Sequence, residues 1–162
     1  MMTQTFFNLL LMLFVTNGAP VIATYLFQSH GNQPLDRGTL LADGQPLLGP
    51  SKTWRGLAAA LFSACALSLL LGYTIAFGFT FGLLVMTGDL ASSFIKRRRA
   101  MAPSARATGL DQLPESFIPA LYAVMVLERD WWWAVLLSLA FMLLEMAISK
   151  PLYRLHIRNR PH

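Results

Sequence analysis

The chain has 162 residues, of which 55% are hydrophobic and 13% charged, and its formal net charge is +5. This composition excludes an ordinary soluble domain, in which about 25% of residues are charged. The single cysteine, Cys65, excludes a disulfide framework. The positive charge suits anionic lipids and phosphates better than nucleic acid, because no soluble nucleic-acid-binding fold is predicted.

Apolar stretches recur along the chain. A helix needs roughly 20 residues to cross a hydrocarbon core about 30 Å thick. We predict spans over residues 5–28, 54–71, 74–95, 111–127 and 130–148. The predicted fold class is therefore all-α, a single polytopic membrane domain over residues 1–162 with about five transmembrane helices.

The first span begins without basic residues, which favours a retained helix over a cleaved signal peptide. Asn17, Gly18 and Pro20 are predicted to interrupt this helix at mid-membrane depth. Broken backbone at that depth is tolerated only where it faces protein or a water-filled cavity. Whether Asn17 is functional or structural is left open.

The loop after the first span, PLDRGTLLADGQPLLGPSKTWRG, runs from Pro34 to Gly56. Its GPSKT segment does not fit the Walker pattern, since no glycine directly precedes the lysine. Small residues with Lys52 and Arg55 at a helix start nevertheless favour a phosphate-binding loop. The alternative is a polar loop at the membrane interface.

The third span ends in GDLASSFIKRRR, with Asp89 about 9 Å inside its end. An ionisable residue at this depth usually faces a cavity or a partner. Helical spacing places Asp89, Ser93 and Lys96 on one stripe. The alternative to a functional acid is a salt bridge from Asp89 to Lys96 that stabilises the helix.

The apolar part of the fourth span, FIPALYAVMVL, is too short to cross a bilayer. We therefore predict that this helix begins within LDQLPES, which places Asp111 and Glu115 on one face. Two acids at this spacing repel each other, and a metal ion or basic residues would relieve the repulsion. The alternative is an interfacial helix start, where the dipole favours acids. Pro119 should free the carbonyl of Glu115 and favour a kink or a polar pocket.

The fifth span begins at ERDWWWAV, where Trp131, Trp132 and Trp133 are predicted to form an interfacial aromatic belt. Glu145 lies within the span. Pairing with a nearby base and a direct function are both kept as interpretations of this acid.

Basic residues are distributed unevenly between the two ends of the predicted spans. Of the 13 Lys and Arg residues, 12 lie on one side, with Arg129 alone opposite. Basic loops stay cytoplasmic, so we predict an external N-terminus, a cytoplasmic C-terminus and an active site facing the cytoplasm. Carboxylates able to hold Mg²⁺ would meet bases able to hold phosphates there, as phosphoryl-type transfer requires.

Three segments also resemble a known family. PLDRGTLLADGQPLLGPSKTWRG, GDLASSFIKRR and LDQLPESFIPAL are similar, in order and character, to motifs of the CDP-archaeol synthases, small five-span relatives of CDP-diacylglycerol synthase. The resemblance runs from Asn17 to about Leu121. It implies a Mg²⁺-dependent cytidylyltransferase that makes a CDP-lipid and pyrophosphate from CTP and a lipid phosphate.

The resemblance also implies roles for individual residues. The catalytic set is Asp89, Ser93, Lys96 and Asp111. The nucleotide- and phosphate-binding set is Asp36, Asp43, Lys52, Thr53, Arg55, Arg97 and Gln112. The metal ligands are Asp89, Asp111 and Glu115. Arg98 and Arg99 are expected to contact anionic lipids.

Archaeal members usually read DQLDF and GKT, where this chain has DQLPES and SKT. The lipid is therefore left open between an archaeal ether lipid, a phosphatidate and another lipid phosphate. Two further functions are kept. One is a lipid kinase or other nucleotide-dependent phosphotransferase, and the other is a small transporter or lipid-binding scaffold.

Overall fold

The computed structural model describes residues 2–102, 107 and 109–154. It contains five α-helices in this part of the chain, and no strand longer than an isolated bridge. The helices are α1 (Met2–Phe27), α2 (Trp54–Leu70), α3 (Ile75–Arg98), α4 (Gln112–Val126) and α5 (Trp132–Arg154). The predicted all-α fold class and its five helices are confirmed. Three arginines of the charge count lie outside the described residues, namely Arg106, Arg158 and Arg160. The C-terminus also lies outside them.

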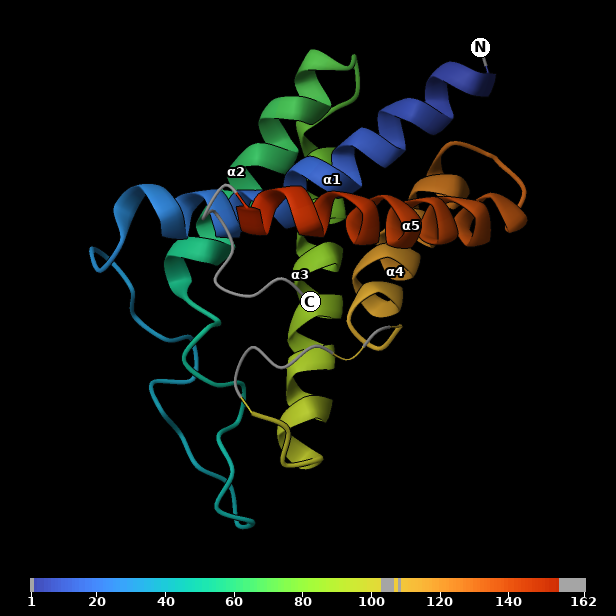
Figure 1. Ribbon diagram of the computed structural model, residues 1–162. Coiled ribbons are helices and arrows are strands. Elements are labelled where there is room, and N and C mark those ends of the chain that lie inside the picture. The colour runs from blue at the N-terminus through green and yellow to red at the C-terminus, as the bar shows by residue number, and fades with distance from the viewer. Residues whose placement is uncertain (1, 103–106, 108, 155–162) are drawn as a thin grey trace.

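Each helix packs against the next along the chain, and α1 also contacts α5 and closes the bundle. Figure 1 shows the N-terminus and the α2–α3 turn at one end of the molecule. The long loop before α2 and the connection after α3 lie at the other end. We call the latter the polar end, because it carries Lys52 and the basic last turn of α3.

Two helices are long and apolar enough to cross a membrane by length and composition, within residues Thr3–Phe27 and Ile75–Arg98. The apolar segments Trp54–Leu70 and Trp132–Ile148 are shorter. The fourth helix begins at Gln112, inside the LDQLPES segment where it was predicted to begin. It continues through Pro119, which is buried.

The predicted interruption of the first helix is wrong. Helix α1 is continuous from Met2 to Phe27 with Pro20 inside it, although Figure 1 shows that it changes direction along its length. The Asn17 amide donates to the carbonyl of Leu13 (2.9 Å), and the Thr24 hydroxyl donates to that of Pro20 (2.8 Å). Such local hydrogen bonds let a helix bend at proline without ending.

Small residues bring α3 close to both of its neighbours. A Cβ on Gly78 would lie 2.5 Å from the Cβ of Ser68 in α2, and one on Gly82 would lie 2.8 Å from that of Ala64. A Cβ on Gly88 would lie 2.2 Å from the carbonyl oxygen of Pro114 in α4. Close approach at small residues is a common way for membrane helices to associate. It sets the position of α3 at both interfaces.

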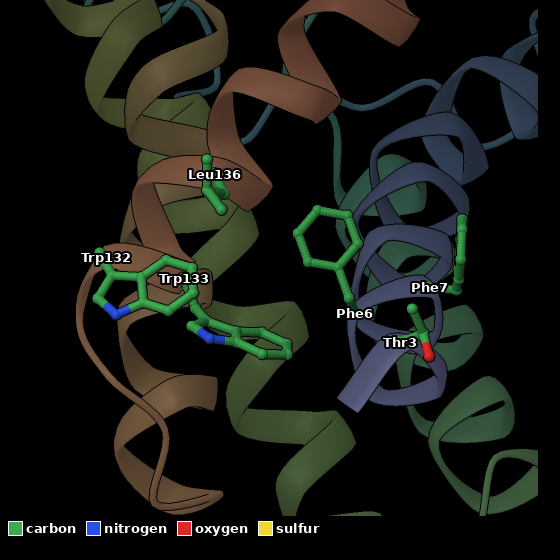
Figure 2. Close-up of a pocket in the computed structure, with 6 residues that line it drawn as sticks. All are labelled: Thr3, Phe6, Phe7, Trp132, Trp133 and Leu136. Carbon is green, nitrogen blue, oxygen red and sulfur yellow. The ribbon is translucent and has the colours of Figure 1, made fainter. Parts of the chain in front are cut away.

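The tryptophan belt is only partly as predicted. Trp131 and Trp132 are exposed, but Trp133 is buried, only 5% exposed, and belongs to the apolar core. Its ring meets that of Phe6 edge-on, with 6.0 Å between centroids, and Figure 2 shows both beside a pocket between α1 and α5. Trp133 is the second residue of α5 and lies on the face that packs against α1.

Candidate functional site

The centre of the polar end is an ion pair between the first loop and the third helix. The Lys52 ammonium lies 2.6 Å from Oδ1 and 2.7 Å from Oδ2 of Asp89. Both side chains are largely buried, about a fifth exposed (19% and 22%). A residue from the first loop thus neutralises the acid inside α3, as an acid at this depth requires.

The backbone around Lys52 is held by the loop. Its carbonyl accepts from the Leu35 N–H (2.8 Å), and its N–H donates to the Gly49 carbonyl (3.2 Å). Pro34 and Thr53 form an antiparallel bridge beside it. The Thr53 hydroxyl then accepts from the Gly56 N–H (3.1 Å) and caps α2. Thr53, predicted to bind nucleotide, therefore has a helix-capping contact in this structure.

A second ion pair joins α3 to the start of α4. The Lys96 ammonium lies 2.6 Å from Oδ1 of Asp111, and Oδ2 of Asp111 accepts from the Ala107 N–H (2.9 Å). The alternative of an Asp89–Lys96 salt bridge is wrong, because each residue pairs with a different element. Helical spacing placed the two residues on one stripe but could not show which neighbouring elements face it.

Glu115 lies between these pairs. It is 9% exposed and within electrostatic range of Asp89, Asp111 and Glu145, and of the Lys52 ammonium. The close approach at Gly88 brings α4 against α3 at this level. Glu115 is therefore a buried carboxyl with other carboxylates near it.

Three other predicted residues lie buried at this end. Ser93 is 2% exposed, on α3 between the levels of the two ion pairs. Gln112 is also 2% exposed, and its Oε1 accepts from the Gly109 N–H (2.8 Å). Arg97 is 3% exposed and donates to the Ala102 carbonyl (2.9 Å). The motif residues of α3 and α4 are thus gathered in one region.

Within the described residues, no group of three or more His, Cys, Asp or Glu side chains is arranged to hold a metal ion. The acids predicted as ligands are instead engaged by lysines or buried beside one another. Their donor chemistry nevertheless fits Mg²⁺, which prefers carboxylate oxygens. A buried carboxyl close to other carboxylates is also a setting that a divalent cation would stabilise.

Asp36, predicted to bind nucleotide, organises the first loop. Its carboxylate accepts from the backbone N–H groups of Gly49 (2.8 Å), Leu48 (2.9 Å) and Gly38 (3.0 Å). Burial would raise the pKa of this carboxyl, but these hydrogen bonds outweigh burial and hold the pKa below its usual value. These three hydrogen bonds all lie within the loop.

Asp43 attaches the loop to the end of α3. Both its oxygens lie 2.6 Å from Nη1 of Arg98, and Arg98 Nη2 donates to the carbonyls of Gln45 and Pro46. The Gln45 N–H, together with the Arg98 guanidinium, lowers the pKa of the Asp43 carboxyl. The Arg98 guanidinium is thus held by the loop, and its contact with lipid stays a prediction.

Arg55 lies away from the two ion pairs. Its guanidinium donates to the carbonyls of Gln28 (3.1 Å) and His30, just after the end of α1. The side chain turns towards α1 in this structure, and its part in a phosphate-binding loop stays a prediction. Positive charge beside the last carbonyls of a helix is favourable.

Sequence reasoning did not identify two features of this region. One is the Gly88 contact with α4, and the other is the attachment of the loop by Arg98. The signal for Gly88 was present, since a glycine inside an apolar helix often marks close packing. No local signal could pair Arg98 with Asp43, which lies 55 positions earlier in the chain.

Comparison with known proteins decides the family. A family model described as CarS-like CDP-archaeol synthase matches residues 2–75 and 64–162, nearly the whole chain. The chain belongs to the CDP-archaeol synthase family. The resemblance found in the motifs is thereby confirmed, and it extends beyond the segments that carried it.

Individual family members agree with this assignment. A CDP-archaeol synthase of Halorubrum lacusprofundi is 31% identical over 185 residues, covering 99% of this chain and 97% of the relative. One from Hyperthermus butylicus is 39% identical over 115 residues, covering 66% of each chain. One of these relatives therefore matches nearly the full length of the chain, and the other about two thirds of it.

A solved structure of the same kind supports the membrane fold. It is described as an intramembrane enzyme for archaeal membrane lipids biosynthesis, and it is 31% identical to this chain. The two superpose with a TM-score of 0.75 over 88% of this chain and 90% of the other. The chain is therefore a membrane-embedded protein with the fold of that enzyme.

Proposed function

We propose that this chain is a cytidylyltransferase that makes a CDP-lipid and pyrophosphate from CTP and a membrane lipid phosphate. Family membership over nearly the whole chain supports the reaction class. The observation that carries the site is the meeting of Asp89, Asp111 and Glu115 with Lys52 and Lys96 at one end of the bundle.

In the proposed reaction an oxygen of the lipid phosphate attacks the α-phosphorus of CTP. The bond from that phosphorus to the bridging oxygen breaks, and pyrophosphate leaves with the electron pair. The nucleophile belongs to the substrate, so the protein needs no covalent nucleophile of its own. Its contribution is to position the two substrates and to stabilise charge.

The basic side chains of the polar end would bind the phosphates. Lys52, Lys96 and Arg97 lie on two elements that meet there, the first loop and the last turns of α3. Arg97 is buried beside the first loop, where a Cβ on Gly49 would lie 3.8 Å from its Cδ. A guanidinium fixed in this way can bind phosphate oxygens with defined geometry.

Mg²⁺ is proposed as the cofactor, held by Asp89, Asp111 and Glu115. When bound, it would neutralise charge on the phosphates during transfer. Glu115 and Asp111, one turn apart, would hold the ion against α4, and Asp89 would hold it against α3. Ser93 and Gln112, buried at the same end, would orient the phosphates.

We further propose that the polar end faces the cytoplasm, with the N-terminus outside. The uneven distribution of Lys and Arg supports this orientation. CTP is then available on the side where Lys52 and Asp89 lie. The lipid phosphate would enter from the inner half of the bilayer.

A labelling experiment tests the reaction. Purified protein in detergent is incubated with Mg²⁺, a lipid phosphate and CTP carrying label on either the α- or the γ-phosphate. Cytidylyl transfer puts only the α-label into the lipid, whereas a lipid kinase puts in only the γ-label. Comparing an ether-linked isoprenoid glycerol phosphate with an ester-linked phosphatidate identifies the lipid class. A lipid that acquires the γ-label would contradict the proposal.

A further inference from the structure

Lys52 lies where a cation bound to Asp89 would lie. Its ammonium contacts both carboxylate oxygens, at 2.6 and 2.7 Å. A metal ion coordinated by these oxygens would meet the ammonium at short range, and two cations in a partly buried site repel strongly. Lys52 in this position and a metal ion on Asp89 therefore exclude each other.

The loop allows the Lys52 side chain to move while its backbone stays in place. The backbone is held by Leu35 and Gly49, and the loop is attached to α3 through Asp43 and Arg98. A lysine side chain has a flexible four-carbon stem that can carry its charge several ångströms from a fixed Cα. The ammonium can leave Asp89 without unfolding the loop.

Lys52 also neutralises Asp89 when no metal ion is bound. Asp89 lies near the buried Glu115 carboxyl, and the Lys52 ammonium offsets the charge of Asp89. Without a cation, Asp89 would be an uncompensated carboxylate beside a buried one, which is costly. The lysine satisfies Asp89 until another cation arrives.

We propose that Lys52 is an exchangeable counter-ion of Asp89. In the free protein it neutralises the acid. A divalent cation takes its place, and the released ammonium then binds the phosphates of CTP. This inference rests on the proposed function. Magnesium and nucleotide should therefore each strengthen the binding of the other. Both require the Lys52 ammonium to leave Asp89, and once one ligand has bound, the free energy of this separation has already been spent.

The second pair provides an internal reference. The Lys96 side chain is more buried than that of Lys52, 11% against 19% exposed. The other oxygen of its partner Asp111 is held by a backbone N–H. Lys96 also starts from a helix, whose backbone and packing restrict its side chain. We expect Lys96 to respond much less to magnesium than Lys52.

Lysine labelling tests the exchange directly. The chain contains three lysines, Lys52, Lys96 and Lys150, so acetylation by a water-soluble amine reagent can be followed at each by mass spectrometry. The full-length protein is labelled without metal, with Mg²⁺ alone, and with Mg²⁺ and CTP in the absence of lipid phosphate. Magnesium alone should raise the labelling rate of Lys52 about fivefold or more, the scale of typical site coupling. Added CTP should lower it again.

Two variants show that Asp89 is the cause. In Asp89→Asn, Lys52 should react quickly without metal and should not respond to magnesium. Asp130→Asn makes the same chemical change at an exposed position outside the polar end, and should keep the wild-type response. An unchanged Lys96 rate in both variants shows that the fold is intact.

The same preparations are assayed for CDP-lipid formation. If CDP-lipid forms and the Lys52 rate is the same with and without magnesium, the counter-ion exchange is overturned and the proposed function stands. If Lys52 responds but no CDP-lipid forms, the exchange stands and the proposed reaction fails. If neither occurs, both are overturned.

Discussion

At the scale of single residues, the polar end contains two kinds of charged contact. Lys52–Asp89 and Lys96–Asp111 join different elements around Glu115. The contacts of Asp36, Asp43 and Arg55 stay within the loop or at its attachments, although the motif also includes these residues. Losing a residue of the first kind should affect catalysis, and losing one of the second kind should affect stability.

Asp89→Asn should abolish activity and also lower stability, because it leaves the Lys52 ammonium without its carboxylate. The lost hydrogen bond between two charged groups accounts for about 2 kcal/mol. In the double variant Asp89→Asn, Lys52→Met the stability should return and the activity should not. Thermal unfolding and CTP turnover, measured over a range of Mg²⁺ concentrations, check both outcomes. An active double variant would remove Asp89 from the mechanism.

Arg55→Ala should lower the free energy of unfolding by about 1.5 kcal/mol, the contribution of a hydrogen bond from a charged group, and leave CTP affinity nearly unchanged. The reason is that its guanidinium binds the carbonyls after α1 and not the ion-pair region. Arg37→Ala, at an exposed position of the same loop, is the matched control and should change neither quantity. A large loss of CTP affinity in Arg55→Ala, with unchanged stability, would instead support its predicted role in phosphate binding.

Asp36 should make stability depend on pH at acid values. Its folded-state pKa is below the ordinary 3.8, so the ionised carboxyl stabilises the fold. This contribution is fully present above the ordinary pKa and is lost as the pH falls through the lower, folded-state value. The difference in melting temperature between wild type and Asp36→Asn should be constant near neutral pH and shrink below about pH 4. A difference that grows on acidification would show the opposite sign of shift.

At the scale of helices, the α3–α4 contact determines whether the acids of the two helices share one region. Gly88 makes this contact possible, because any Cβ there would overlap the backbone of α4 at Pro114. The overlap is with backbone, so no side-chain rotation can relieve it. Asp89 follows directly in the chain, and its position relative to Glu115 depends on how closely the helices approach.

Gly88→Ala should therefore push α3 and α4 apart, lowering stability by about 3 kcal/mol, as overpacking does, and reducing CDP-lipid formation. Gly18→Ala in α1 is the matched control, since a Cβ there meets nothing within 4 Å. It should be neutral or slightly stabilising. Melting temperature and turnover of the two variants check this prediction. Wild-type behaviour of Gly88→Ala would mean that the two helices can separate at no cost.

At the scale of the whole molecule, the bundle has two chemically different ends. The polar end carries both ion pairs around Glu115 and the attached loop, whereas the opposite end carries Trp131 and Trp132. Lys and Arg on short loops retain them in the cytoplasm. The access of CTP to the polar end depends on the orientation in which the protein is inserted into the membrane.

Of two reporters fused after His162, the one that works in the cytoplasm should be active and the one that works only outside it should be inactive. Green fluorescent protein should fluoresce there, and alkaline phosphatase should stay inactive, because it folds only outside the cytoplasm. A fusion within the α2–α3 turn, after Gly72, is the opposite-side control. A periplasmic or external reporter at the C-terminus would overturn the orientation, and with it the access of CTP to the polar end.

The sequence by itself determined the five helices, the start of α4 within LDQLPES and the family, because length, hydropathy and short motifs are local properties of the chain. It also identified Asp89, Asp111 and Glu115 as unusual, since acids in apolar helices are costly wherever they lie. Only the tertiary structure decided their partners. Lys52 reaches Asp89 across 37 positions, and Arg98 reaches Asp43 across 55. Such pairings depend on how closely α2, α3 and α4 pack, and therefore on contacts at Gly78, Gly82 and Gly88. A glycine in an apolar helix indicates close packing, but no local pattern encodes which segment it packs against.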